Sequence, residues 1–139
     1  MAVATLTKIE AKAIWAEACE AAEAAALAKV PTPMIVGSPT TPLGSDIDPA
    51  KQTWYVPSGM CGFAWVTIKP ARGALVTYLK SQDVGSKGYY GGWQIWCGRE
   101  LSPTAGATQS IEIKEAAAGA AAAVLRKYGI EAYAQSRLD

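Results

Sequence analysis

The stretch 59-GMCGFAWVTIKPARG-73 decides the fold that the sequence predicts. From Phe63 to Lys69 it is rich in aromatic and β-branched residues, which is typical of a strand. Gly59 closes the turn before this strand. Pro70 suits the first position of a helix, because its missing N–H has no partner there in any case. The stretch therefore predicts a turn, a strand and the start of a helix.

The two faces of this strand differ in chemistry. Because successive side chains of a strand point to opposite sides, one face carries Phe63, Trp65, Thr67 and Lys69. The other face carries only small and aliphatic side chains. The first face is aromatic and ends in a positive charge, so it is either part of the core or a binding site. Its exposure to solvent separates these two interpretations.

The N-terminal part predicts a long helix. Thr7 and Glu10 fit a capping box, in which each side chain satisfies a backbone N–H at the start of a helix. The residues that follow are dominated by alanine and other strong helix formers, so we expect a helix over 8–29 that ends before Pro31. Its wide alanine face suits packing inside the chain. The alternative is a homo-oligomer formed through this Ala-rich helix.

The remaining elements complete a two-layer α+β fold. Residues 31–53 contain five prolines and predict a long loop with one short strand at 34–36. Further strands are expected at 54–56, 93–97 and 130–135, and helices over 70–82 and 110–128, the second ending at Gly129. This order predicts a mixed sheet of four to five strands with the helices packed on one face. A length of 139 residues predicts a single domain, with an α+β core over 54–139.

Composition argues against several classes of function. The 13 Lys and Arg residues nearly balance the 12 Asp and Glu residues, so no global field favours nucleic acid or an anionic membrane. No apolar run approaches the roughly 20 residues that cross a bilayer, and we expect no membrane partner. The chain has no histidine, which removes the commonest general base. No metal site, cofactor or catalytic residue is predicted.

The cysteines are expected to be structural. Cys19, Cys61 and Cys97 are widely spaced and form no CxxC pair, so a zinc site is not predicted. Cys61 and Cys97 would be neighbours if their strands paired. Free cysteine is among the most buried residue types, which favours inert thiols.

One alternative function is binding of single-stranded nucleic acid. The run from Gly62 to Ile68 comes close to the RNP1 pattern of RNA-recognition motifs, in which outward aromatic rings stack on bases. Cys61 stands where that pattern has a basic residue, and Ile68 stands where it has its last aromatic. In this interpretation Phe63 and Trp65 stack on bases and Lys69 contacts phosphate.

A second aromatic segment lies at 87-KGYYGGW-93. It combines flexible glycines with aromatic rings that supply a large contact area at low entropic cost, so it is either a recognition loop or a turn that covers the sheet edge. Charged residues also stand at strand ends, where they form an anion site or ion pairs. The candidate binding residues are Phe63, Trp65, Lys69, Tyr89, Tyr90, Trp93, Arg99 and Arg137.

Several runs resemble a family of small proteins encoded by tailed bacteriophages. They are 60-MCGFAWVTIKP-70, 87-KGYYGGWQIW-96 and 129-GIEAYAQSRLD-139. The resemblance implies a phage origin and no catalytic residues. We therefore expect a non-enzymatic binding protein in the host cytoplasm, which engages a host macromolecule through the aromatic face and the 87–93 loop.

Three alternatives remain open at this point. The first is the single-stranded nucleic-acid-binding protein described above. The second is a virion or assembly component, favoured by the Ala-rich helix and the neutral charge. The third is a small nucleotide-acting enzyme, which requires Lys69, Arg99 and Arg137 to converge on one pocket.

Overall fold

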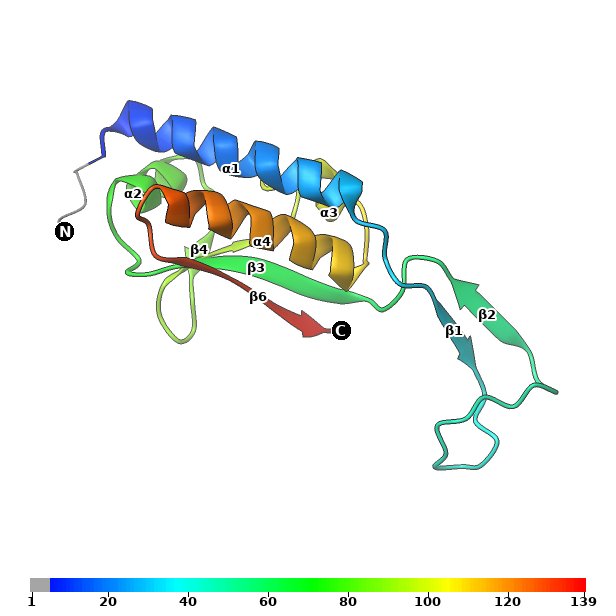
Figure 1. Cartoon of the computed structure of the whole chain (residues 1–139). Helices are drawn as coiled ribbons and strands as arrows, with labels where there is room; N and C mark the ends of the chain where they lie inside the picture. Colours follow the sequence, from blue (N-terminus) through cyan, green and yellow to red (C-terminus); the bar gives the residue numbers. More distant parts are fainter. Residues whose placement is uncertain (1–5) are drawn as a thin grey trace.

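The computed structural model describes residues 6–139 (Figure 1). The elements, in chain order, are α1 (Lys8–Ala28), β1 (Met34–Gly37), β2 (Thr53–Val56), β3 (Gly62–Ile68), α2 (Ala74–Ser81), β4 (Ser86–Lys87), β5 (Trp93–Trp96), α3 (Pro103–Gly106), α4 (Ile111–Lys127) and β6 (Ala132–Leu138).

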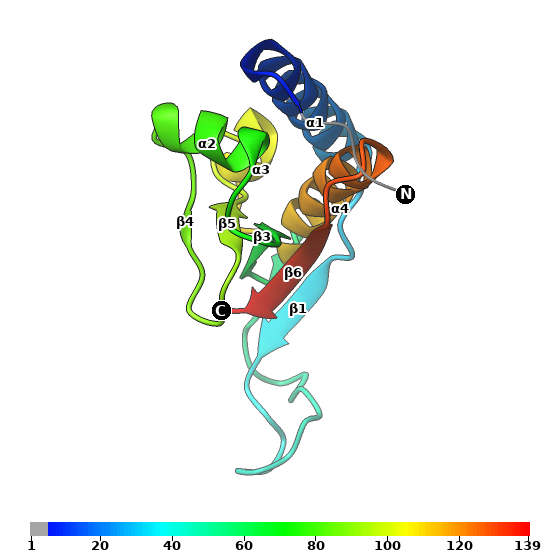
Figure 2. The same cartoon turned by 90° about the vertical axis from the view of Figure 1, so that its left-hand side faces the viewer.

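Among residues 6–139, the main sheet has four strands in the order β4-β5-β3-β6. The helices lie on one side of it, with α4 against β3 and β6 and with α1 packed on α4 (Figures 1 and 2). This arrangement confirms the two-layer α+β class. All strand pairs of the sheet are antiparallel, where a mixed sheet was expected. The chain makes the additional strand β4 after α2, and this reversal brings β5 alongside β3 in the opposite direction.

The capping box at the start of α1 is confirmed. The Thr7 hydroxyl accepts from the Glu10 N–H at 3.1 Å, and the Glu10 carboxylate accepts from the Thr7 N–H at 3.2 Å. Ala11, Ala18 and Ala22 are fully buried, because α1 packs closely on α4 within the same chain. Self-association through the outer face of this helix stays a prediction.

Helix α2 follows the 59–73 stretch, and helix α4 follows residues 98–110. α2 begins at Ala74 and not at Pro70, because Gly73 precedes the helix with a φ of 110°, a conformation outside the helical region that favours glycine. α4 follows the prediction closely, and Gly129 ends it at a φ of 80°. The N-terminal bound of α2 was therefore predicted wrongly, and the C-terminal end of α4 correctly.

The strands β1 and β2 form a separate two-stranded sheet. In Figure 1 this hairpin extends beyond the end of the main sheet. The loop predicted over 31–53 is thus largely the first strand and the long connection of a hairpin, and residues 54–56 do not join the main sheet. Trp54 and Tyr55 are neighbours in β2, so their side chains point to opposite faces of the hairpin, and they are 52% and 67% exposed.

The core lies between the helices and the covered face of the sheet. Its largest fully buried side chains come from β3, β5, α2 and α4 and the loop before α3: Val66, Ile95, Val76, Leu79, Leu125 and Leu101. The short elements β4 and α3 were not predicted, since two and four residues are too few to show a period.

Candidate binding surface on the open sheet face

The side of the main sheet opposite the helices is the candidate site. Strand register identifies its members, because directly opposed residues share a face. Trp65 is opposed by Trp96 on β5 and by Gln135 on β6. We call this surface the aromatic face. It comprises Phe63, Trp65, Thr67, Gln94, Trp96, Tyr133, Gln135 and Arg137.

Three rings form a cluster at one end of the aromatic face. Trp96 meets Phe63 edge-on, with centroids 5.9 Å apart and an angle of 89° between the planes. Its centroid lies 4.9 Å from that of Trp65. Phe63 and Trp65 are half-buried and Trp96 is 42% exposed. The helices of the described residues lie on the other side of the sheet, with α4 packed on β3 and β6 (Figure 2), so these rings cover one another and remain partly open to solvent.

Gln135 holds the middle of the face in place. Its side-chain oxygen accepts from the Trp65 indole N–H at 3.0 Å and from the Thr67 hydroxyl at 2.7 Å. Thr67 is only 3% exposed, and this bond satisfies its hydroxyl. This hydrogen bond fixes the orientation of the Trp65 indole.

Two cations flank the Phe63 end of the face. The Arg137 guanidinium carbon lies 5.4 Å from the Phe63 ring centroid, and the Lys114 ammonium lies 5.7 Å from it. Both distances fit cation–π attraction. At the other end of the face, the Tyr133 hydroxyl donates to Glu131 at 2.6 Å, which raises the pKa of Tyr133. The aromatic cluster thus has a positive border.

The loop aromatics lie apart from this cluster. Tyr89 and Tyr90 are each 91% exposed and pack edge-on against each other at 4.8 Å. Trp93 is opposed by Ile68, so alternation places it on the helix side of the sheet. Its indole donates to the Val84 carbonyl at 3.1 Å. The structure therefore does not bring Trp93 into the aromatic face.

The three basic candidates are also separated. Lys69 follows one end of β3, whereas Arg137 is opposed to Phe63 near the other end. Six residues of strand correspond to about 20 Å. Arg99 is exposed in the loop before α3. Lys69 and Arg137 therefore do not converge on one pocket, which was the arrangement that the nucleotide-acting alternative required.

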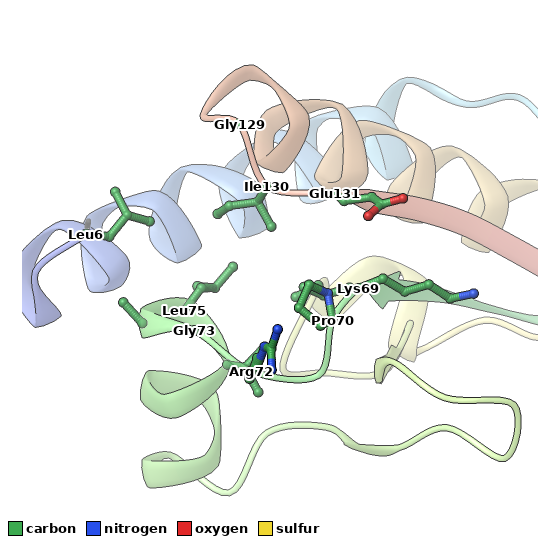
Figure 3. A pocket seen from close by; sticks show the side chains of 12 residues that line it. Leu6, Lys69, Pro70, Arg72, Gly73, Leu75, Gly129, Ile130 and Glu131 are labelled. Carbon is green, nitrogen blue, oxygen red and sulfur yellow. The ribbon is translucent and has the colours of Figure 1, made fainter. Parts of the chain in front are cut away.

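A hollow of about 460 Å³ lies between the end of β3, the start of α2 and the turn before β6 (Figure 3). Leu75 and Ile130 contribute to an apolar wall, and Lys69, Arg72 and Glu131 supply charge. Figure 3 shows the Lys69 side chain pointing away from that wall. In the part of the chain that the structure describes, the polar side chains of this hollow do not converge on one point in the way that orients a substrate.

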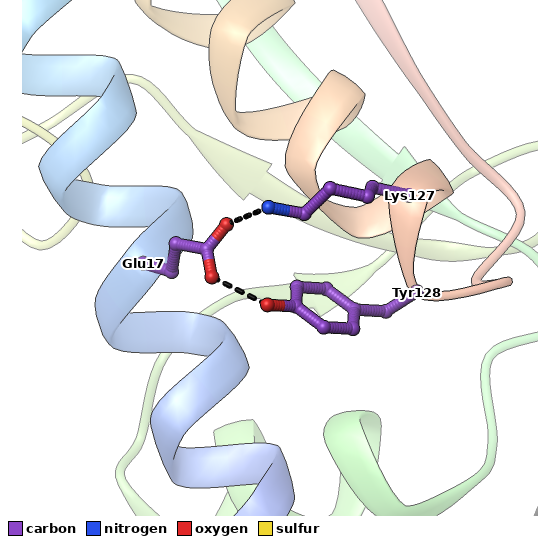
Figure 4. Close-up of polar contacts among 3 residues, drawn as sticks. All are labelled: Glu17, Lys127 and Tyr128. Atoms are coloured by element: carbon purple, nitrogen blue, oxygen red, sulfur yellow. Dashed lines mark hydrogen bonds and ion pairs between the residues drawn. The ribbon is translucent and has the colours of Figure 1, made fainter.

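A polar cluster joins α1 to the end of α4 (Figure 4). The Glu17 carboxylate pairs with Lys127 and accepts from the Tyr128 hydroxyl at 2.5 Å. The hydrogen bond from Lys127, and to a smaller extent that from Tyr128, holds the pKa of Glu17 below its ordinary value. The bond to Glu17 in turn raises the pKa of Lys127. Every charge has a partner on the neighbouring helix, which indicates a structural ion pair.

The cysteines are free and do not form a site. Burial raises the pKa of the Cys97 thiol to about 12 and that of Cys19 to about 11. Cys61 is half-buried at the start of β3, and Cys97 donates a backbone bond to Ala64, so the two are not opposed. No group of three metal-ligating side chains occurs within residues 6–139. In the same range, no helix is long and apolar enough to cross a membrane.

Comparison of the chain with protein-family models, curated proteins and solved structures gives no match. The aromatic face must therefore be interpreted from its own geometry. Sequence reasoning found Phe63, Trp65 and Arg137 but missed Trp96, Gln135 and Lys114. Trp96 lay inside a predicted strand, and side-chain alternation along that strand places it on the other face of the sheet from Trp93. The other two needed the strand register and the packing of α4.

Proposed function

We propose that this protein is a non-enzymatic binding protein that engages a host protein through the aromatic face, in a cell infected by a bacteriophage. The observation that carries the proposal is the open cluster of Phe63, Trp65 and Trp96. A group of large rings left uncovered on a folded sheet is characteristic of interaction surfaces.

The composition of the face supports a protein partner. Tryptophan and arginine are the residue types that most often dominate the energy of protein interfaces, and here Arg137 borders the ring cluster. The Gln135 bond to Trp65 orients the cluster in advance. The positive border favours a partner surface that combines an apolar side chain with neighbouring carboxylates.

Affinity capture from bacterial lysate followed by binding measurements with the purified captured protein tests this proposal. Trp96→Ala removes the most exposed ring of the cluster, and Trp54→Ala is a matched control that removes a similarly exposed tryptophan from the β1–β2 hairpin. We expect Trp96→Ala to weaken binding at least tenfold and Trp54→Ala to leave it unchanged. Equal binding by the wild type and Trp96→Ala would rule out the aromatic face as the site.

Binding of single-stranded nucleic acid is the second candidate, favoured by the two cations beside Phe63. Bases stack on aromatic rings with little sequence preference, while Lys and Arg contact phosphates. Titration of tryptophan fluorescence with single-stranded oligonucleotides at low and high salt tests it. Quenching that salt weakens and that Arg137→Ala reduces supports this function. Absence of quenching at low salt excludes it.

A further inference from the structure

The free edge of β6 is the feature that carries a further inference. Within residues 6–139, β6 pairs only with β3 and forms one border of the sheet. Glu131 accepts from the Lys69 N–H and the Asp139 N–H donates to Cys61, so the odd-numbered residues direct their backbone groups toward β3. The N–H and C=O groups of Ala132, Ala134, Ser136 and Leu138 consequently point outward.

Within residues 6–139, most of this edge lacks the usual protection against pairing. Of its seven residues, Ala132 is fully buried and the six from Tyr133 to Leu138 are exposed. The strand has no proline, and its single charge, Arg137, lies over the Phe63 ring of the aromatic face. Among the described residues, one side chain bonds to these outward backbone groups: Arg126 donates to the Ala132 carbonyl at 2.8 Å. Long exposed edges of this kind add a further strand readily.

Helix α4 lies above this edge and places opposite charges at its two ends. Glu115 accepts from the Ser136 hydroxyl at 2.7 Å, and Arg126 binds the carbonyl of Ala132. Both side chains are exposed. Between them, Gly119 and Ala123 are small, and a Cβ added to Gly119 would meet nothing within 4 Å. The helix above the edge therefore has an acidic end, an open middle and a basic end.

We propose that β6 pairs antiparallel with β6 of a second copy of this chain, forming a two-fold symmetric dimer with a continuous eight-stranded sheet. The positions of Glu115 and Arg126 determine the register. Glu115 contacts Ser136 and Arg126 contacts Ala132, so the point midway between the two charges falls at Ala134. A two-fold axis at Ala134 places each Glu115 opposite Arg126 of the other copy.

The same axis also pairs the free backbone N–H and C=O groups of the edge. Ala134 opposes Ala134, and Ala132 opposes Ser136, so residues whose groups point outward meet in hydrogen-bonded pairs. Ala132 is fully buried and its carbonyl accepts from Arg126, so pairing at this end requires Arg126 to leave that carbonyl and turn to Glu115 of the other copy. A hollow of about 90 Å³ lined by Glu115, Ala134, Gln135 and Ser136 lies at this edge, where the partner strand would enter. One self-complementary arrangement thus joins both the charges and the free backbone groups. It leaves the two aromatic faces side by side and does not depend on the proposed function.

Sedimentation equilibrium of the full chain tests the dimer, with circular dichroism and thermal unfolding as checks of folding. We expect the wild type to show twice the 14.6 kDa mass of the chain. Glu115→Arg should give folded monomers, because it sets two positive charges against each other across the axis. The double variant Glu115→Arg with Arg126→Glu restores opposite charges and should recover the dimer. Ala134→Pro, which removes an outward N–H, should also give monomers.

The control is Ala16→Leu, which lies on the exposed side of α1 and should leave the dimer intact. A wild type that stays monomeric up to millimolar concentration overturns the proposal. So does a dimer that persists in folded Glu115→Arg, or one that Ala16→Leu abolishes. If Ala134→Pro fails to fold, the charge exchange still decides the outcome.

Discussion

Replacing Ala18 by leucine tests whether the alanine face of α1 is an internal packing surface. Ala18 is fully buried, and the helix that carries it makes most of its contacts with α4. Leucine adds an isopropyl group where no space exists, so the two helices must separate or the side chain must leave its preferred rotamer. Overpacking of this kind costs about 1–3 kcal/mol.

The expected shift in melting temperature follows from the size of the chain. Unfolding entropy is about 2.1 cal/mol/K per residue, or roughly 0.3 kcal/mol/K over 139 residues. A loss of about 2 kcal/mol therefore lowers the melting temperature by roughly 7 °C. Ala16→Leu is the matched control, because it makes the same change on the exposed side of α1.

Thermal unfolding followed by circular dichroism measures both variants against the wild type. We expect a clear decrease for Ala18→Leu and a shift within about 0.5 kcal/mol for Ala16→Leu. Equal melting temperatures for Ala18→Leu and the wild type would refute close packing of α1 on α4. The alanine face would then be free to contact another copy of the chain.

Three other predictions concern polar and ionisable groups. Gln135→Ala leaves the buried Thr67 hydroxyl without its acceptor and should cost about 1–3 kcal/mol in urea unfolding, whereas a purely surface role for Gln135 predicts almost none. Burial raises the pKa of Cys97 to about 12, so its thiol should resist a thiol reagent at pH 8 until the chain unfolds. The free energy of unfolding should also fall as pH rises from about 9, because the thiol then ionises in the unfolded chain but not in the folded one. Rapid native labelling of Cys97 would contradict this. The hydrogen bond from Lys127 lowers the pKa of Glu17, so this ion pair stabilises the fold above about pH 4.5, and the stabilisation is lost as pH falls through the lowered pKa. Glu17→Gln should therefore make stability depend less on pH in the acid range. An unchanged dependence of stability on pH would show that the pair contributes nothing.

Local rules were sufficient for part of the fold. The capping box at Thr7, the helix that ends at Gly129 and the strand through Trp65 each depend on interactions within a few residues. The class α+β follows from the order of such elements. The start of α2 was missed, because the chain between Pro70 and Gly73 takes a path that local propensity does not specify.

The candidate site shows the same division. Alternation alone separated Phe63 and Trp65 from the aliphatic face of β3. It did not show that Trp96 joins them or that Trp93 lies on the other side, since this requires the register between β3 and β5. Charge counting likewise did not reveal the cations around Phe63, which come from α4 and β6.

The sequence by itself determined the longer helices and strands, apart from the start of α2, and the two-faced character of β3, because these depend on backbone propensity and on side-chain alternation. Only the tertiary structure decided which face stays open, since that depends on where the helices pack. It also decided that the β1–β2 hairpin stands apart and that β6 forms the edge. Pairing between distant strands is a property of the whole chain, and no short segment carries it.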